Sequence, residues 1–294
     1  MPSPMFNGHS LVGELKRVLV CSPEAAGWAD DRVNRWQELG FLHPPNVVIA
    51  QTQHEEFCRQ LAATGADVQH LPESPELTLD AAYTHDASFS TDHGLIAMHP
   101  GKKNRVAEAR RHREFCGHLG VQMLGEITQP ATTEGGDIVW LDAKTLLIGN
   151  GFRTNKQGIA QMRALLGPHG VEVLEASLPY GLGPSACLHL MSLMSMLDDS
   201  TVLVDLPWMA VETVQLLRGR KLKLIEIDST ERDTLAVNVL ALGKKRLLAI
   251  EQNEKTNRRL RDAGFDVRTF PGDELCVNGG GGPTCLTRPL LRGE

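Results

Sequence analysis

The sequence repeats one order of structural elements five times. In each repeat, two short apolar segments flank a polar turn and are followed by an amphipathic helix and a further apolar segment. The strand pairs expected from this pattern are Ser88–Met98, Asp137–Ile148, Leu193–Val204 and Asn238–Ile250. The helices expected after them are Asn104–Gly117, Asn155–Leu166, Met209–Leu217 and Glu254–Ala263, and the closing strands are Val121–Leu124, Val171–Leu174, Lys221–Ile227 and Asp266–Phe270.

The fifth repeat is divided between the two ends of the sequence. A helix at Gln53–Ala63 and a strand at Asp67–Leu71 lack a hairpin, which Leu286–Leu291 supplies by pairing with Leu15–Cys21. This pairing would close a ring and remove exposed sheet edges. Self-similarity at about 50 residues is typical of propellers and arrays. We therefore expect residues 1–294 to form one α/β domain, a five-bladed propeller of ββαβ repeats around a central pocket.

Composition excludes several classes of protein. Hydrophobic residues make up 41% of the 294 residues, but no run approaches the roughly 18 apolar residues of a membrane helix, and no signal peptide is recognisable. The six cysteines show no CxxC spacing, which argues against a zinc knuckle or a disulfide framework and favours free thiols in the cytoplasm. A net charge of −6 argues against nucleic acid as a partner.

Polar residues recur at the start of the first strand of each hairpin. These positions hold Asp86, Glu134, His189, Asn238 and Cys285. In a closed ring the equivalent positions of all repeats converge near the axis. Charged residues at the mouth of apolar strands are costly unless they are paired. We therefore expect a pocket that combines carboxylates, an imidazole and a thiol.

Cys285 is the expected nucleophile of this pocket. It follows the glycine-rich run 278–284, whose four consecutive glycines we interpret as serving close backbone approach to a ligand and not core packing. An imidazole such as His189 would hold the thiol as thiolate and act as general acid and base, with Glu134 orienting it. The structural alternatives are an inert thiol, a core histidine between Leu188 and Leu190, and a turn glutamate.

Two arginines lie at the start of expected helices: Arg105 opens the helix Asn104–Gly117, and Arg153 lies just before the helix Asn155–Leu166. Arg105 and Arg153 lie where a cation opposes the helix dipole, so each needs another partner. A guanidinium group is well shaped to bind a carboxylate, and a surface salt bridge is the alternative. The histidines show no spacing typical of metal ligands, so we expect no metal site.

Taken in order, these motifs resemble those of a known group of enzymes. The motifs are Asp80 with Asp86, Arg105-Val-Ala-Glu108, Glu134-Gly-Gly-Asp137, Arg153-Thr-Asn155, Leu188-His189-Leu190 and Gly282-Pro-Thr-Cys285. From about Leu15 to Leu291 the chain resembles the guanidino-group-modifying enzymes of the pentein fold. Within them it is most similar to the dimethylarginine dimethylaminohydrolase family.

The resemblance implies a role for each of these residues. Asp86 would bind the substrate guanidinium, Asp80 its α-amino group, and Arg105 with Arg153 its α-carboxylate. Glu134 and His189 would transfer protons, with Cys285 as nucleophile.

The implied enzyme is a hydrolase that converts dimethylarginine to citrulline and dimethylamine through a covalent thiouronium intermediate. It would use no cofactor and no metal. Its partner would be a small guanidino substrate, and the chain could form a homodimer.

Three positions depart from the pattern of related enzymes. His85 stands where dimethylargininases commonly carry an acid, and Met191 stands where deiminases and amidinotransferases carry the Asp of His-x-Asp. Met191 favours a substituted, more apolar guanidinium. Third, Trp28, Trp36 and Phe41 lie in the segment 27–45, where they could cap a pocket or pack on the surface. The alternative functions are arginine deiminase or dihydrolase, amidinotransferase, and a non-catalytic binding pentein.

Overall fold

The computed structural model of the chain describes residues 6–184, 186 and 188–293. The helices within this range are α1 (Trp36–Leu39), α2 (Val47–Ala62), α3 (Val106–His118), α4 (Lys156–Leu166), α5 (Val211–Gly219) and α6 (Glu254–Asp262). The strands are β1 (Glu14–Val20), β2 (Asp67–His70), β3 (Ser88–Thr91), β4 (Gly94–Ala97), β5 (Met123–Glu126), β6 (Ile138–Asp142), β7 (Thr145–Asn150), β8 (Glu172–Ser177), β9 (Met194–Asp198), β10 (Thr201–Val204), β11 (Lys223–Glu226), β12 (Leu240–Gly243), β13 (Arg246–Ile250), β14 (Asp266–Phe270) and β15 (Arg288–Gly293).

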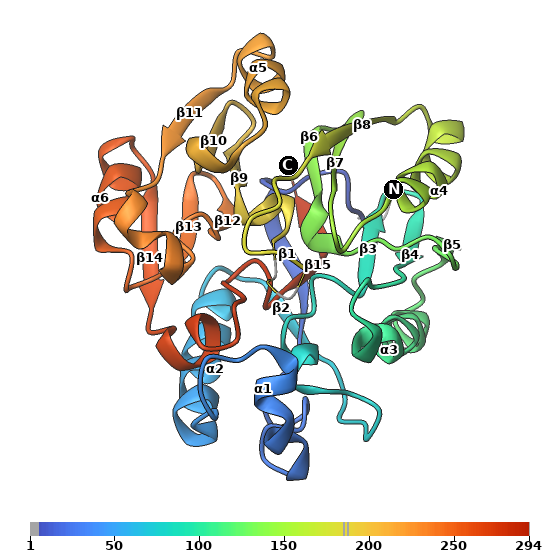
Figure 1. Ribbon diagram of the computed structural model, residues 1–294, viewed down its shortest axis with the longest axis vertical. Coiled ribbons are helices and arrows are strands. Elements are labelled where there is room, and N and C mark those ends of the chain that lie inside the picture. Colours follow the sequence, from blue (N-terminus) through green and yellow to red (C-terminus); the bar gives the residue numbers. More distant parts are fainter. Residues whose placement is uncertain (1–5, 185, 187, 294) are drawn as a thin grey trace.

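These strands form five three-stranded sheets, arranged around a common centre in Figure 1. In four sheets an antiparallel hairpin is followed, after a helix, by a parallel strand; these are β3-β4-β5, β6-β7-β8, β9-β10-β11 and β12-β13-β14. In the fifth sheet, β15-β1-β2, β1 pairs antiparallel with β15 and parallel with β2. The predicted ββαβ repeats and the predicted pairing of the two chain ends are therefore confirmed.

Neighbouring sheets contact one another through their first strands. β15 contacts β3, and Phe89 on β3 stacks against Trp140 on β6 with ring centroids 5.8 Å apart. β6 contacts β9, β9 contacts β12, and β12 contacts β1. The sheets thus follow one another in the order that the predicted five-bladed arrangement requires, and helices α2 to α6 lie on its outside (Figure 1).

The local sequence explains these elements. Strands β4 and β10 are buried along their whole length, which agrees with their continuous apolar runs. Helix α4 buries Ile159, Met162 and Leu166, whose spacing of three and four residues places them on one face. The side chain of Asn155 caps this helix by accepting a hydrogen bond from the Gly158 amide.

The beginning of helix α2 differs from the prediction. The helix starts at Val47 rather than Gln53, because the Asn46 side chain caps it by accepting from the Ile49 amide. Val48 and Ile49 are exposed, so the first turn lacks the buried apolar face on which the prediction relied.

Two further expectations concern membranes and thiols. Every helix in the described residues is too short or too polar to span a bilayer. The thiols of Cys21, Cys58, Cys116 and Cys276 are free, and Cys187 lies outside the described residues.

Candidate active site

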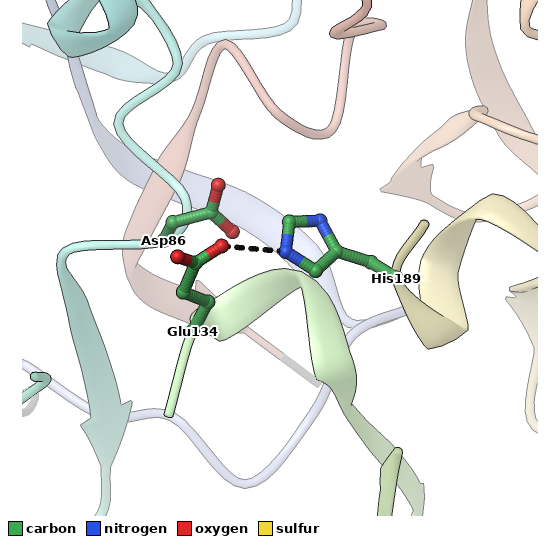
Figure 2. Close-up of side chains that lie close together, drawn as sticks. All are labelled: Asp86, Glu134 and His189. Carbon is green, nitrogen blue, oxygen red and sulfur yellow. Dashed lines mark hydrogen bonds and ion pairs between the residues drawn. The ribbon is translucent and has the colours of Figure 1, made fainter. Parts of the chain in front are cut away.

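Three side chains from different repeats meet at the centre of the fold. Figure 2 shows Asp86, Glu134 and His189, whose ligand atoms all lie within 4.8 Å of one another. The imidazole Nε2 of His189 donates to Oε2 of Glu134 over 2.7 Å. Glu134 has no exposed surface and His189 is 4% exposed. A buried carboxylate at this distance both orients an imidazole and stabilises its protonated form.

The Glu134-Gly-Gly-Asp137 motif makes this close arrangement possible. A β-carbon at Gly136 would lie 2.5 Å from Nδ1 of His189 and 2.9 Å from Oδ1 of Asp86, so a side chain there would displace both groups. The amide of Gly136 also donates to Oδ1 of Asp86 over 2.8 Å. The absence of a side chain at Gly136 therefore allows Asp86 and His189 to lie close together.

Asp137, the last residue of the motif, fixes the segment that carries the histidine. Its Oδ1 accepts from the amide of Leu190 over 2.9 Å. Asp137 is fully buried, and burial raises its pKa to about 6. The sequence prediction assigned Asp137 no role, although its place in the motif was the available signal.

Glu134 is also held by the Arg153-Thr154-Asn155 motif. Arg153 donates to Oε2 of Glu134 over 2.9 Å, and the Thr154 hydroxyl accepts from the Glu134 amide. Burial alone would raise the pKa of Glu134, but the hydrogen bond from His189 and the charge of Arg153 outweigh it and lower the pKa. The motif thus keeps a buried glutamate ionised, with Asn155 beginning helix α4 beside it.

Arg105 forms a buried ion-pair network and not the surface salt bridge that was the alternative. Its Nη1 donates to Asp86 over 2.5 Å and its Nη2 to Glu108 over 2.8 Å, and Arg105 is 3% exposed. Burial opposes ionisation of Asp86, but His189 and Arg105 hold the pKa of Asp86 below its usual range. For Glu108 burial prevails over Arg105 and raises the pKa to about 7. Of the two acids that contact Arg105, Asp86 and Glu108, Asp86 is therefore the one that is kept charged.

Asp80 lies nearby with two donors that the sequence prediction missed. Lys102 donates to Oδ1 and Asn104 to Oδ2, each over 2.8 Å. Lys102 also donates to the carbonyl of Leu39, which connects the Asp80 carboxylate to helix α1. Asp80 is 5% exposed. These contacts hold both oxygens of Asp80 in place.

Cys285 is held by the first strand of the preceding repeat. Asn238 donates through Nδ2 to the sulfur of Cys285 over 3.1 Å, and its Oδ1 accepts from the Thr284 amide over 2.9 Å. The two residues were predicted to converge, and their side chains are in contact. A donor directed at sulfur stabilises the thiolate form.

The glycine-rich run before Cys285 packs against protein side chains. A β-carbon at Gly282 would lie 2.6 Å from Oδ1 of Asn238. The interpretation that these glycines do not serve packing is therefore wrong for Gly282, because its backbone closely approaches the amide that holds Cys285. Asn278, at the start of the run, accepts from the amides of Leu42 and His43 through Oδ1.

The segment 27–45 is packed onto this run. Trp28 is fully buried and Phe41 is 5% exposed, with their rings edge to face at 5.2 Å. The indole nitrogen of Trp28 donates to the carbonyl of Leu79. Trp28 and Phe41 therefore belong to the core, which rules out the alternative of surface packing for these two residues.

His85 and Met191, the two departures from related enzymes, line the same cavity together with Thr284. His85 Nδ1 donates to the carbonyl of Thr287 over 2.8 Å, and its Nε2 has no partner among the described residues. Burial lowers the pKa of His85 to about 3, so the ring is neutral and Nε2 is an acceptor. His85 is therefore a neutral acceptor and Met191 a thioether, in a cavity that Asp86, Glu134, His189 and Cys285 do not line.

Asp86, Glu134 and His189 lie close enough together to share a metal ion. Each carboxylate is already neutralised by a guanidinium group, Asp86 by Arg105 and Glu134 by Arg153. Glu134 is in addition hydrogen-bonded to His189. This pairing suits proton transfer, and the absence of a metal site stays a prediction.

Comparison with known proteins supports the enzyme class. A curated relative from Streptomyces coelicolor, named N(G),N(G)-dimethylarginine dimethylaminohydrolase, is 28% identical over 244 residues, covering 81% of this chain and 85% of its own length. A structure of that enzyme from Pseudomonas aeruginosa, a mutant complexed with citrulline, has a TM-score of 0.74 at 23% identity, covering 93% of this chain and 98% of its own.

A second similar structure belongs to an enzyme with a different reaction. The N-terminal domain of ArgZ, an arginine dihydrolase from Cyanobacteria, has a TM-score of 0.80 at 20% identity, covering 94% of this chain and 98% of that chain. These likenesses confirm the predicted fold. The family described as N,N dimethylarginine dimethylhydrolase, eukaryotic, matches residues 43–292. The chain thus belongs to the dimethylarginine dimethylaminohydrolase family, hydrolases that act on C–N bonds.

Proposed function

We propose that this enzyme hydrolyses dimethylarginine to citrulline and dimethylamine, with residues 1–294 acting as one catalytic domain. The observation that carries the proposal is the 2.7 Å contact between His189 and the fully buried Glu134, beside an ionised Asp86. The contact between Asn238 and the sulfur of Cys285 supports Cys285 as the nucleophile.

The first half of the reaction forms a covalent intermediate. Asp86 binds the substrate guanidinium and fixes its plane; each of its oxygens has one protein donor and room for another. The Cys285 thiolate attacks the guanidinium carbon and forms a C–S bond. The bond from this carbon to the dimethylamine nitrogen breaks, and His189 gives its proton to the leaving amine. A thiouronium group is left on Cys285.

The second half releases citrulline. His189, now neutral, takes a proton from a water molecule, which attacks the thiouronium carbon. A C–O bond forms, the C–S bond breaks, and the sulfur of Cys285 returns to its starting state. Glu134 stabilises the protonated imidazole in both halves. Two easier substitutions at the guanidinium carbon, first by sulfur and then by water, thus replace one difficult substitution.

The amino-acid end of the substrate is assigned to Asp80, Arg105 and Arg153. Asp80 would take the α-amino group in exchange for its contact with Lys102. Arg153 and Arg105 would bind the α-carboxylate. All three nitrogens of Arg105 already donate to protein acceptors, so it would reach the substrate by giving up one of them.

The residue types at positions 85 and 191, neither of which is acidic here, support a methylated substrate. A plain guanidinium would favour a further carboxylate, whereas N-methyl groups remove donors and add apolar surface. A neutral His85 and the thioether of Met191 match that change. Arginine deiminase, arginine dihydrolase and amidinotransferase are the competing activities.

The experiment is an assay of the purified enzyme with asymmetric dimethylarginine and, separately, with arginine. Citrulline, ornithine, ammonia and dimethylamine are quantified for wild type, Cys285→Ala and the control Cys58→Ala, whose thiol lies on α2. We expect citrulline and dimethylamine from wild type and Cys58→Ala only. Ornithine and ammonia from arginine would replace the proposal with a dihydrolase, and turnover by Cys285→Ala would remove Cys285 as nucleophile.

A further inference from the structure

A second group of buried polar side chains lies where strand β15 meets β3, β6 and the segment before β1. It lines a small cavity, here called the arginine cavity, whose walls include Trp140, Arg288, Arg292, Ser90 and Leu11. Cys285, Glu134 and His189 do not line this cavity. None of the described residues that line it is acidic.

Three residues that line this cavity each carry an N–H donor without a partner among the described residues. Nε1 of Trp140, Nε of Arg288 and Nε of Arg292 are buried and donate to no acceptor among the described residues. The three residues are 3%, 2% and 5% exposed. An unsatisfied buried donor is costly, and native structures contain few of them. Three on one cavity indicate a missing acceptor.

The two arginines also lack a negative partner of their own. Arg288 donates through Nη2 to the carbonyl of His85, and Arg292 through Nη1 to the carbonyls of Gly13 and Ala241. Within residues 6–184, 186 and 188–293, no carboxylate forms an ion pair with either side chain. Carbonyl oxygens satisfy hydrogen bonds but supply no charge, so two cations stay buried without compensation.

The charge of Asp86 does not change this conclusion. Asp86 acts on Arg288 from a distance, but its carboxylate is already ion-paired with Arg105. Burial lowers the pKa of Arg288 to about 10 and that of Arg292 to about 9. Both groups are therefore still charged at neutral pH.

We propose that the arginine cavity binds a small inorganic anion, chloride being the one at hand in a cell, between the orphan donors of Trp140, Arg288 and Arg292. The cavity is small, with room for about one water-sized species, which excludes sulfate or phosphate and leaves a monatomic anion as the candidate. A water molecule would satisfy the donors but would leave both guanidinium charges uncompensated.

The position of the cavity gives the anion a structural role. Arg288 and Arg292 lie on β15, Trp140 lies on β6, and Asn7 accepts from the Arg292 amide. A bound anion would therefore tie the last strand to another repeat and to the segment before β1. Because the anion binds the folded state only, chloride would stabilise the protein by mass action.

The test compares thermal unfolding in sodium chloride and in sodium gluconate at equal ionic strength. We expect the Tm in 200 mM chloride to exceed that in gluconate by at least about 2 °C and to rise with the logarithm of chloride concentration. Arg292→Met and, as a second variant in case the first does not fold, Trp140→Phe should reduce this difference. The control Arg220→Met removes a half-buried arginine that is paired with Asp142 and lies outside the arginine cavity, and this variant should keep the difference.

Crystals soaked in sodium bromide locate the ion independently of stability. An anomalous peak within hydrogen-bond distance of Nε of Arg288 or Arg292 is the expected result. Equal Tm values in the two salts for wild type, a chloride effect that both variants keep in full, or a cavity without bromide would each overturn the proposal.

Discussion

His189 and Glu134 share a 2.7 Å hydrogen bond in a place where the glutamate has no exposed surface. The two side chains come from different repeats, so their contact depends on the arrangement of the whole fold. The charge of Arg153 holds Glu134 ionised, and ionised Glu134 in turn favours protonated His189. In the proposed mechanism, proton transfer at the substrate rests on these three side chains, which can be tested one at a time.

Glu134→Gln keeps the shape of this side chain and removes its charge. We expect kcat for citrulline formation to fall by about 10²- to 10⁴-fold, because the imidazolium loses its stabilising partner. KM should change much less, since Glu134 contacts His189 and Arg153. Steady-state kinetics with a circular-dichroism check of folding measure both. The control Glu114→Gln, at an exposed position, should have wild-type kcat and KM. A Glu134→Gln enzyme with wild-type kcat would contradict the role of Glu134 in stabilising the imidazolium.

Gly136→Ala tests the close packing of the acid and the imidazole. Its β-carbon would lie 2.5 Å from Nδ1 of His189, so the ring must move and turnover should fall at least about 10²-fold. The matched control is Gly117→Ala in helix α3, where an added β-carbon meets no atom within 4 Å. That control should keep full activity and gain roughly 0.5–1 kcal/mol of stability. The turnover rate and Tm of both variants are measured, and full activity of Gly136→Ala would contradict the need for close packing at this position.

Asn238→Asp tests the support of the nucleophile. It replaces the donor that faces the sulfur of Cys285 with a negative charge. Because an anion beside sulfur disfavours the thiolate, we expect iodoacetamide to label Cys285 at pH 7 at least about tenfold more slowly. Asn238→Ala should give a smaller decrease. Labelling is followed by mass spectrometry of the Cys285 peptide, and unchanged rates in both variants would show that the contact has no effect on reactivity.

We expect Asp137 to make the stability of the wild-type protein depend on pH, and we expect Asp137→Asn to remove this contribution. Burial raises the folded-state pKa of Asp137 from 3.8 to about 6, so its protonated form is favoured in the folded protein. The stability it contributes is fully present below pH 4 and is lost as the pH rises through about 6, a loss on the order of 2–3 kcal/mol. The amide variant keeps an oxygen for the Leu190 amide and does not titrate.

The difference in Tm between Asp137→Asn and wild type should therefore increase from pH 4 to pH 7. Thermal unfolding in a series of buffers at constant ionic strength measures it. Comparing the two proteins at each pH cancels the contributions of acids such as Asp86 and Glu134, whose lowered pKa values act in the opposite direction. A difference that does not vary with pH would show that Asp137 is ionised in the folded protein throughout this range.

The repeat pattern of the sequence was sufficient to predict the sheets. Alternating apolar and polar segments identified all four hairpins, and the missing fifth hairpin predicted the pairing of β1 with β15. The prediction was less accurate at helix α2, because Val48 and Ile49 are apolar residues on an exposed turn. A pattern of hydrophobicity cannot distinguish such residues from a buried face.

Individual contacts in the site were harder to predict than the set of residues. The sequence motifs predicted that Asp86, Glu134 and His189 lie close together, and the structure shows that they do. The contacts of Lys102 with Asp80 and of Asn238 with Cys285 depend on side-chain rotamers in neighbouring repeats, which sequence spacing does not encode. The orphan donors of Arg288 and Arg292 are likewise a property of the folded interior.

The pairing of β15 with β1 has a consequence for when the enzyme becomes chemically competent. Asn7 and Arg292, which exchange hydrogen bonds beside these strands, are 285 residues apart in the sequence. Bringing such distant segments together is among the slow events of folding. Cys285 lies three residues before β15, so the contact of its sulfur with Asn238 depends on that late event. If Cys285 is the nucleophile that we propose, an incompletely folded chain would carry the thiol without its Asn238 contact, and reactivity toward guanidino groups would begin only with the finished enzyme.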